Sequence, residues 1–222
     1  MDTKGKLIVF EGIDGSGKSA HYRRVCARLQ EDGVDYRHIV FPRYDNESSA
    51  LIRMYLNGEF GSNPTDVNAY TASTFFAVDR FASYKRDWGE YHSAGGFVLS
   101  DRYTTSNAVH QASKLPVEER EKFFRWLADF EYAKLGLPAP DQVLWLDMPI
   151  ELAVANLRRR EADTHTSADI HEVDEDYLIA CRDAAAQAAA FYGWKRIACV
   201  DGQGALRSVP DIHEEIMALI ND

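Results

Sequence analysis

The segment at residues 12–19, Gly-Ile-Asp-Gly-Ser-Gly-Lys-Ser, constrains this chain more than any other. It matches the pattern GxxxxGK[ST] in full, follows an apolar run at residues 7–10 and opens a helical pattern at residues 18–31. Its glycines let backbone N–H groups turn inward around phosphate oxygens, and the helix N-terminus adds positive potential. An ordinary glycine-rich turn is the competing interpretation, and the strand–loop–helix context argues against it. The segment therefore predicts a nucleoside triphosphate site, with Lys18 on the β- and γ-phosphates and Ser19 on Mg²⁺. The residues expected to contact the nucleotide are Gly12, Ile13, Asp14, Gly15, Ser16, Gly17, Lys18 and Ser19.

Strands and helices alternate along the rest of the chain. Short apolar runs predict five strands, at residues 6–11, 36–41, 95–101, 141–147 and 196–201. Helical patterns fall between them, at 18–31, 48–56, 65–87, 105–113, 117–135, 149–160, 177–192 and 209–220. Apolar strands alternating with helices favour an α/β fold: a five-stranded parallel sheet with helices on both faces, as in P-loop nucleotide kinases. Ligands of such sheets bind at the carboxyl ends of the strands, so we expect the site there. We expect one domain over residues 1–222.

The composition limits the partners of the chain. Its 222 residues carry a net charge of −10, with a pI near 5.2. Phosphate backbones and anionic membranes are held by basic surfaces, so an acidic chain is not expected to bind nucleic acid or membranes. A small phosphorylated ligand needs only a local basic pocket and stays possible.

The cysteines and the apolar runs bear on the location of the chain. Cys26, Cys181 and Cys199 are three in number, widely spaced and not in a metal-ligand pattern, which favours reduced thiols in a cytoplasmic protein. The apolar run near the N-terminus is too short for a signal sequence or a membrane span.

The predicted strand ends discriminate between classes of P-loop protein. Asp101 and Asp147 end two strands, and neither is followed by the second carboxylate expected of an ATPase motor; no NKxD guanine motif is present either. Arg43 follows the second strand, where a nucleoside kinase would favour a carboxylate base. Arginine instead clamps a phosphate that is already present. Together with the arginines at 80, 102 and 158–160, this pattern favours a nucleoside monophosphate kinase.

Five motifs extend the pattern along nearly the whole chain: FEGIDGSGKS, FPR, FFAVDR, LSDRYTTSN and PDQVLWLD. In this order and spacing the chain resembles the thymidylate kinase family. The resemblance implies transfer of a phosphoryl group from ATP to dTMP with Mg²⁺, giving ADP and dTDP, by a homodimer. The segment YTASTFFAVDRFASY is apolar around much of its circumference, which suits either a core helix or such an interface.

The resemblance also implies roles for individual residues. Asp14 would hold the 3′-hydroxyl of the substrate sugar, Phe76 would stack on thymine, and Asp101 would lie near Mg²⁺, through water. Arg43 and Arg102 would contact the acceptor phosphate. Arg80 would hydrogen-bond the edge of the base, and Ser106 and Asn107 fall where the family reads the base. The other residues assigned to the substrate by position are Phe41, His110 and Gln111.

Two departures from the family stand out. Many members carry a tyrosine nine residues beyond the aspartate of the DR motif, against the sugar 2′ position; this chain has His110 there, which leaves discrimination against ribonucleotides open. Members also place a basic residue either in the P-loop or in a lid. Gly15 and Ser16 exclude the P-loop, so we expect a lid at about residues 158–176 and favour Arg158 or Arg159 for the transferred phosphoryl group. His165 and His171 in that segment are interpreted as solvated.

Two other functions remain as alternatives. One is a deoxynucleoside kinase acting on thymidine itself, and the other is a binding protein that a nucleotide switches.

Overall fold

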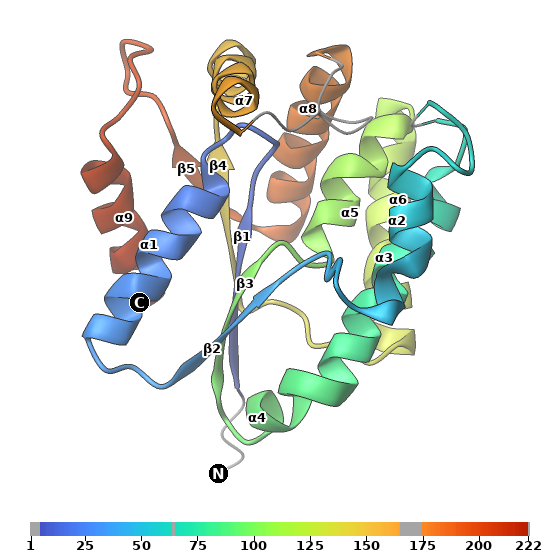
Figure 1. Cartoon of the computed structure of the whole chain (residues 1–222), viewed down its shortest axis with the longest axis horizontal. Coiled ribbons are helices and arrows are strands. Elements are labelled where there is room, and N and C mark those ends of the chain that lie inside the picture. The colour runs from blue at the N-terminus through green and yellow to red at the C-terminus, as the bar shows by residue number, and fades with distance from the viewer. Residues whose placement is uncertain (1–4, 64, 165–174, 222) are drawn as a thin grey trace.

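The fold is a five-stranded parallel sheet with helices on both faces, as the sequence predicts (Figure 1). The computed structural model describes residues 5–63, 65–164 and 175–221. The strands are β1 (Lys6–Glu11), β2 (Tyr36–Val40), β3 (Phe97–Asp101), β4 (Gln142–Asp147) and β5 (Lys195–Ala198), in the order β2-β3-β1-β4-β5. The three inner strands are almost wholly buried, whereas β2 and β5 are half-exposed edges.

The strand order places the carboxyl end of β1 at the centre of the molecule. From β1 the chain passes to β2 and β3 on one side, and then crosses to β4 and β5 on the other. Open α/β sheets bind ligands in the crevice where the strand order reverses in this way. The P-loop follows β1 directly, so the fold sets the phosphate-binding motif in this crevice.

Helices cover both faces of the sheet (Figure 1). α1 and α9 lie together on one face, while α8 packs against α5 and α6 on the other. The helices are α1 (Lys18–Glu31), α2 (Ala50–Leu56), α3 (Ala69–Ser83), α4 (Gly89–Ser93), α5 (Thr105–His110), α6 (Val117–Ala128), α7 (Ile150–Thr164), α8 (Glu175–Tyr192) and α9 (Val209–Asn221). The alanine-rich stretch of α8 is a close contact, because Ala184, Ala185 and Ala188 are fully buried.

Several predicted helix bounds were wrong, for local reasons. The helix expected from residue 65 begins at Ala69, because the side chain of Asn68 caps it and accepts a hydrogen bond from Thr71 N at 2.9 Å. Its end and the end of α6 turn into π-helical segments, Tyr84–Trp88 and Asp129–Lys134. α7 continues to Thr164 and α8 starts at Glu175, inside a stretch expected to be irregular. Residues 165–174, with His165 and His171, lie outside the described residues.

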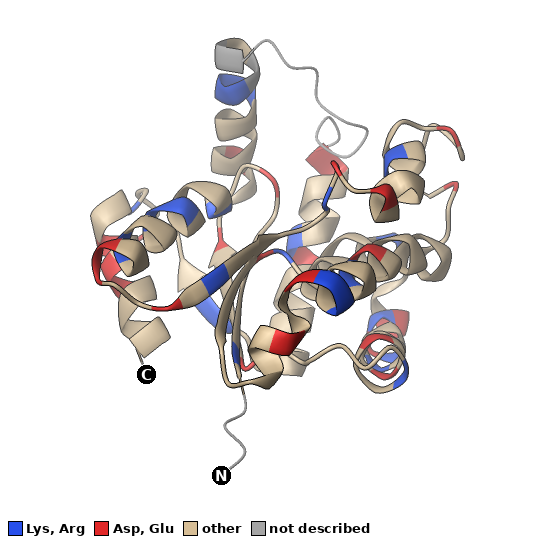
Figure 2. Cartoon of the chain, turned by 60° about the horizontal axis from the view of Figure 1, so that its bottom comes forward, with Lys and Arg blue, Asp and Glu red and all other residues tan. Residues whose placement is uncertain are grey.

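Charged residues are spread over the elements (Figure 2). Acidic and basic positions are interspersed along the ribbon, and basic positions occur near the end of α7 (Figure 2). In the described part of the chain no helix combines the length and the apolar character that a membrane span requires.

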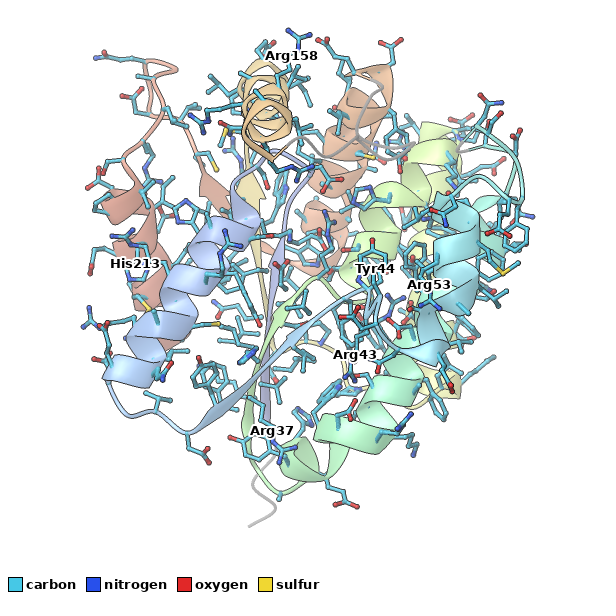
Figure 3. All side chains as sticks on the ribbon, viewed as in Figure 1. Arg37, Arg43, Tyr44, Arg53, Arg158 and His213 are labelled. Atoms are coloured by element: carbon cyan, nitrogen blue, oxygen red, sulfur yellow. The ribbon has the colours of Figure 1, made fainter. Side chains whose placement is uncertain are left out.

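α1 and α9 pack together and carry two buried histidines, His21 on α1 and His213 on α9. His213 is labelled in Figure 3. Burial lowers the pKa of His21 to about 4, and the neighbouring His213 and Arg24 add to this effect. Burial also lowers the pKa of His213. An unfolded histidine binds a proton below about pH 6.5, so between pH 6.5 and 4 the unfolded state holds more protons than the folded state.

We therefore expect the free energy of unfolding to fall as the pH drops from 6.5 toward 4, by up to ~1.4 kcal/mol per pH unit from His21. His21→Gln should flatten this dependence in urea unfolding at pH 7.5, 6 and 5. His38→Gln on the exposed edge strand is the matched control and should leave it unchanged. A His21→Gln protein with the wild-type pH dependence would contradict this account.

Candidate active site

Two cavities meet at the carboxyl edge of the sheet. The inner cleft, about 230 Å³, lies beyond the ends of β1, β2 and β3. The P-loop groove, about 320 Å³, lies between the P-loop and α7. Both cavities are lined by Asp14, Lys18, Ser19 and Arg102. These four side chains therefore stand at the junction, where groups bound in the two cavities would come into contact.

The P-loop is held against α7. Gly15 and Gly17 adopt φ angles of 78° and 80°, in the left-handed region that favours glycine. A Cβ on Gly15 would lie 2.2 Å from the carbonyl oxygen of Ala153 on α7. Asn156 of the same helix donates a hydrogen bond to Gly15 O at 2.8 Å. The curvature of the loop therefore depends on a glycine at position 15.

Lys18 and Asp101 form a buried ion pair at the junction. Burial lowers the pKa of Lys18; Arg102 lowers it further, while Asp101 opposes the shift. The ammonium group thus has a carboxylate partner at the position where the sequence places phosphate oxygens. Asp101 comes from the end of β3, so the pair also joins the P-loop helix to the strand beside β1.

Arg102 is the second cation at the junction, and its backbone is unusual. Its φ angle is 67°, which a non-glycine residue rarely adopts. Its guanidinium contacts Asp14 at 2.5 Å, Glu11 at 3.6 Å and His110 Nε2 at 2.9 Å. Because arginine only donates, Nε2 of His110 accepts this hydrogen bond when the ring is neutral. Backbone strain of this kind concentrates at functional sites, where the surroundings hold it in place.

The charged groups of this cluster stabilise one another. Burial would raise the pKa of Asp14, but Arg102, His110, Lys18 and Arg160 together hold that pKa below its usual value. Burial likewise opposes the charge of Arg102, and the anions around it, led by Asp14 and Glu11, raise its pKa. Both groups are therefore ionised at neutral pH.

Glu11 is a site residue that the sequence analysis missed. It ends β1, is fully buried, and accepts hydrogen bonds from Thr105 Oγ1 and Ser106 Oγ, each at 2.7 Å. A carboxylate at the end of an otherwise apolar strand was the available signal. Because the contacts join residues 94 and 95 positions apart, their partners could not be read from the local pattern.

The far end of the inner cleft is aromatic and polar. Phe76 lines it, and Tyr55 meets that ring edge-on with centroids 6.3 Å apart. Arg80 and Asn107 line the same end, and both bind the buried carboxylate of Glu131. Glu131 is the second site residue that the sequence analysis missed.

Comparisons with known proteins agree on one family. The family model described as thymidylate kinase matches residues 10–216. A thymidylate kinase of Mycobacterium tuberculosis is 33% identical over 178 residues, covering 77% of this chain and 79% of that protein. The chain belongs to the thymidylate kinase family.

More distant relatives extend the match. A probable thymidylate kinase of Pyrococcus horikoshii is 26% identical over 220 residues, covering 98% of this chain and 96% of the relative. A solved thymidylate kinase structure from Candida albicans superposes with a TM-score of 0.71 at 17% identity, covering 98% of this chain and 92% of that one. This superposition shows that the two proteins share a fold.

Most residues that the family resemblance assigns come together. The inner cleft is lined by Asp14, Lys18, Ser19, Phe41, Phe76, Arg80, Asp101, Arg102, Ser106, Asn107, His110 and Gln111. The P-loop groove is lined by Ile13, Asp14, Gly15, Ser16, Gly17, Lys18 and Ser19. Gly12 lies beside the loop, where its N–H donates to Glu11 at 3.0 Å.

Arg43 is an exception to the family assignment. Its guanidinium pairs with Asp87 and donates to Ser83 at 3.1 Å, so it lines an adjoining surface groove and not the inner cleft. The neighbouring Tyr44 lines the cleft instead, and the sequence analysis missed it (Figure 3). Arg53 of α2 fixes this loop by donating to Tyr44 O at 2.6 Å and Asn46 O at 3.0 Å. With its guanidinium turned toward Asp87 and Ser83, the Arg43 side chain does not line the inner cleft in this structure.

Of the two α7 arginines expected to act on the phosphoryl group, only Arg159 lines the P-loop groove. Arg158 is exposed and lies at the outer end of the molecule (Figure 3), so it does not line the P-loop groove. Arg159 and Arg160 do line it. The helical repeat explains the difference, because successive residues of a helix point about 100° apart and only part of a basic run can face the loop. The rest of the proposed lid, residues 165–174, lies outside the described residues.

The P-loop packing predicts the effect of a single methyl group. Gly15→Ala places a Cβ against the backbone of α7 and imposes a left-handed φ on alanine, so we expect the loop to shift and KM for ATP to rise at least about tenfold. Gly33→Ala is the matched control, since Gly33 also has a positive φ but its Cβ would meet no atom within 4 Å. The control should lose ~1 kcal/mol of stability with an unchanged KM. Equal KM values for both variants in steady-state kinetics would contradict the packing argument.

Proposed function

We propose that this chain transfers the γ-phosphoryl group of ATP to dTMP, giving ADP and dTDP. The observation that carries the proposal is the junction of the two cavities, where Lys18 and Arg102 face both. A donor phosphate in the P-loop groove and an acceptor phosphate in the inner cleft would meet between these cations. Membership of the thymidylate kinase family supports the same pair of substrates.

The donor side consists of the P-loop and α7. Backbone N–H groups of the loop and the N-terminus of α1 would hold the β- and γ-phosphates, with Lys18 bridging them. Arg159 and Arg160 line the opposite wall of the groove and would stabilise charge on the phosphoryl group during transfer. In this structure they fit that role better than Arg158, which faces away.

The acceptor side needs no general base. The second pKa of a phosphate monoester is near ~6, so the dTMP phosphate is already a nucleophile at neutral pH. Its requirements are orientation and charge neutralisation, which Arg102 would supply. Asp14 would hold the sugar 3′-hydroxyl, while Ser106, His110 and Gln111 complete the wall of the cleft. Arg43 would join them only after its ion pair with Asp87 opens.

Two oxygen ligands at the junction suit Mg²⁺. The Ser19 hydroxyl and the Asp101 carboxylate both line the inner cleft, and oxygen donors are what this ion prefers. No cluster of three or more His, Cys, Asp or Glu side chains suitable for a metal occurs among the described residues. That sparse set fits an ion held chiefly by nucleotide phosphates and water. Bound there, Mg²⁺ would neutralise charge on the phosphates.

A homodimer in the cytoplasm is part of the proposal. α3 buries one side in the molecule, while Val78 and Phe81 on its other side are 51% and 36% exposed. Such an apolar surface suits an interface with a second copy. All three cysteines are free thiols, in keeping with a reducing compartment.

The proposal is tested by measuring ADP release from MgATP with dTMP, thymidine, dUMP, UMP or no acceptor. We expect strong preference for dTMP and little release without acceptor. Release with thymidine but not dTMP would establish a nucleoside kinase, and thermal stabilisation by nucleotide without any turnover would establish a binding protein. The UMP rate reports whether His110 excludes a 2′-hydroxyl.

Lys18→Ala should reduce turnover with dTMP at least about a hundredfold, because a cation facing both phosphates is lost. Circular dichroism should show that the fold is retained. Wild-type turnover in this variant would remove the P-loop from the mechanism.

Phe76→Ala should weaken dTMP binding by ~1–3 kcal/mol, the range for lost stacking on a base. The measurement is the Kd of dTMP by calorimetry. Phe75→Ala is the matched control, because the adjacent ring does not line the cleft and instead packs against Phe60 and Tyr55. An unchanged Kd for Phe76→Ala would make Phe76 a packing residue only.

A further inference from the structure

Glu131 is a charged residue with no exposed surface, behind the wall of the inner cleft. It lies on the π-helical segment Asp129–Lys134, a geometry frequent at functional sites. Its carboxylate binds Arg80 through two hydrogen bonds, from Nε at 2.7 Å and from Nη2 at 2.6 Å. Oxygen Oε1 also accepts a hydrogen bond from Asn107 Nδ2 at 3.1 Å.

These contacts fix the orientation of the Asn107 amide. Its nitrogen donates to Glu131 and to the carbonyl oxygen of Ser73, at 3.2 Å. Both partners are acceptors only, so a flipped amide would set its oxygen against two other oxygens. The amide nitrogen therefore faces the interior, and Oδ1 remains as the acceptor that Asn107 can offer to the cleft.

The same carboxylate orients Arg80 beside Asn107. Two N–H groups of Arg80 bind Glu131 and one binds Tyr103 O at 3.3 Å, which uses three of the five that a guanidinium has. The remaining groups are donors, and Arg80 lines the cleft. The wall thus presents a donor from Arg80 next to an acceptor from Asn107.

A buried ion pair needs a reason, because well-packed apolar side chains would often be as stable. We propose that Glu131 is a positioning residue that sets this donor–acceptor order and so selects pyrimidines with a 4-oxo group. O4 and N3–H of thymine are an acceptor next to a donor and match the wall. A 4-amino pyrimidine presents a donor next to an acceptor, the reverse order. Rejection is strong where buried polar groups of a site would otherwise lose their partners.

The inference rests on the proposed function, and its test compares two acceptors, dTMP and 5-methyl-dCMP. They share the methyl group, sugar and phosphate and differ only at positions 3 and 4 of the base. Glu131→Gln puts a donor beside Asn107 and allows its amide to flip. We expect KM for dTMP to rise with a smaller change in kcat, and the ratio of kcat/KM between the two acceptors to fall about tenfold or more.

Asp147→Asn is the matched control. Asp147 is also a buried carboxylate that binds two arginines, Arg182 at 2.8 Å and Arg196 at 2.6 Å, but it lines neither cavity. Asp147→Asn should lower the stability of the protein and leave the ratio of kcat/KM between dTMP and 5-methyl-dCMP at its wild-type value. A merely structural role of Glu131 would give the same result as this control, with the ratio unchanged, and would overturn the inference.

The outcomes separate the two proposals. If the wild-type protein does not phosphorylate dTMP, the proposed function fails before any variant is made. If Glu131→Gln does not fold, Glu131→Asp decides, because it keeps the charge but draws the carboxylate back by one methylene. In Glu131→Asp, a higher KM for dTMP and a lower ratio of kcat/KM between dTMP and 5-methyl-dCMP support the inference. Wild-type values of both quantities overturn it.

Discussion

The carboxylate of Glu11 is the constraint on which the site depends. It ends the central strand with no exposed surface, and a buried carboxylate costs several kcal/mol unless hydrogen bonds and a cation compensate it. Here Gly12 N, two hydroxyl groups of α5 and Arg102 do so. The P-loop after β1 and the connection after β3 are thereby fastened to one anion. Any displacement of one segment would leave this charge unsatisfied, so the P-loop and the segment after β3 keep a fixed position relative to each other.

The same arrangement recurs along the cleft and explains how an acidic protein builds a phosphate site. Asp101 pairs with Lys18, Asp14 with Arg102 and Glu131 with Arg80. The overall charge of −10 is spread over the surface, while the cleft holds cations matched to interior anions. Low dielectric makes each of these pairs strong and each unpaired member costly. The placement of cationic side chains in the cleft, more than the net charge of the chain, therefore decides which ligands the cleft attracts.

The sequence predicted those features that depend on residues close together in the chain. It predicted the P-loop, the full extent of α1 and the places of the five strands, because glycine placement, apolar runs and helical spacing are local; the fifth strand, expected at 196–201, is Lys195–Ala198. Most residues that the family resemblance assigns to the substrate line the cleft. It could not predict Glu11 or Glu131 as site residues, because their partners lie 94 and 51 positions away and are brought together only by the sheet and helix packing. Arg43 shows a different limit. The sequence places its backbone beside the cleft, but a nearby Asp87 decides where a long, flexible side chain points.

The pairing of Lys18 with Asp101 and of Arg102 with Asp14 affects how phosphorylated ligands would bind and leave. A phosphate that binds to Lys18 or Arg102 would have to displace Asp101 or Asp14, so its binding free energy would be the difference between two ion pairings. Product release would be easier for the same reason, because Asp101 and Asp14 can pair with the cations again as the product leaves. Such a cleft would bind phosphorylated ligands less tightly and release them faster. This suits an enzyme that must release a product differing from its substrate by one phosphate.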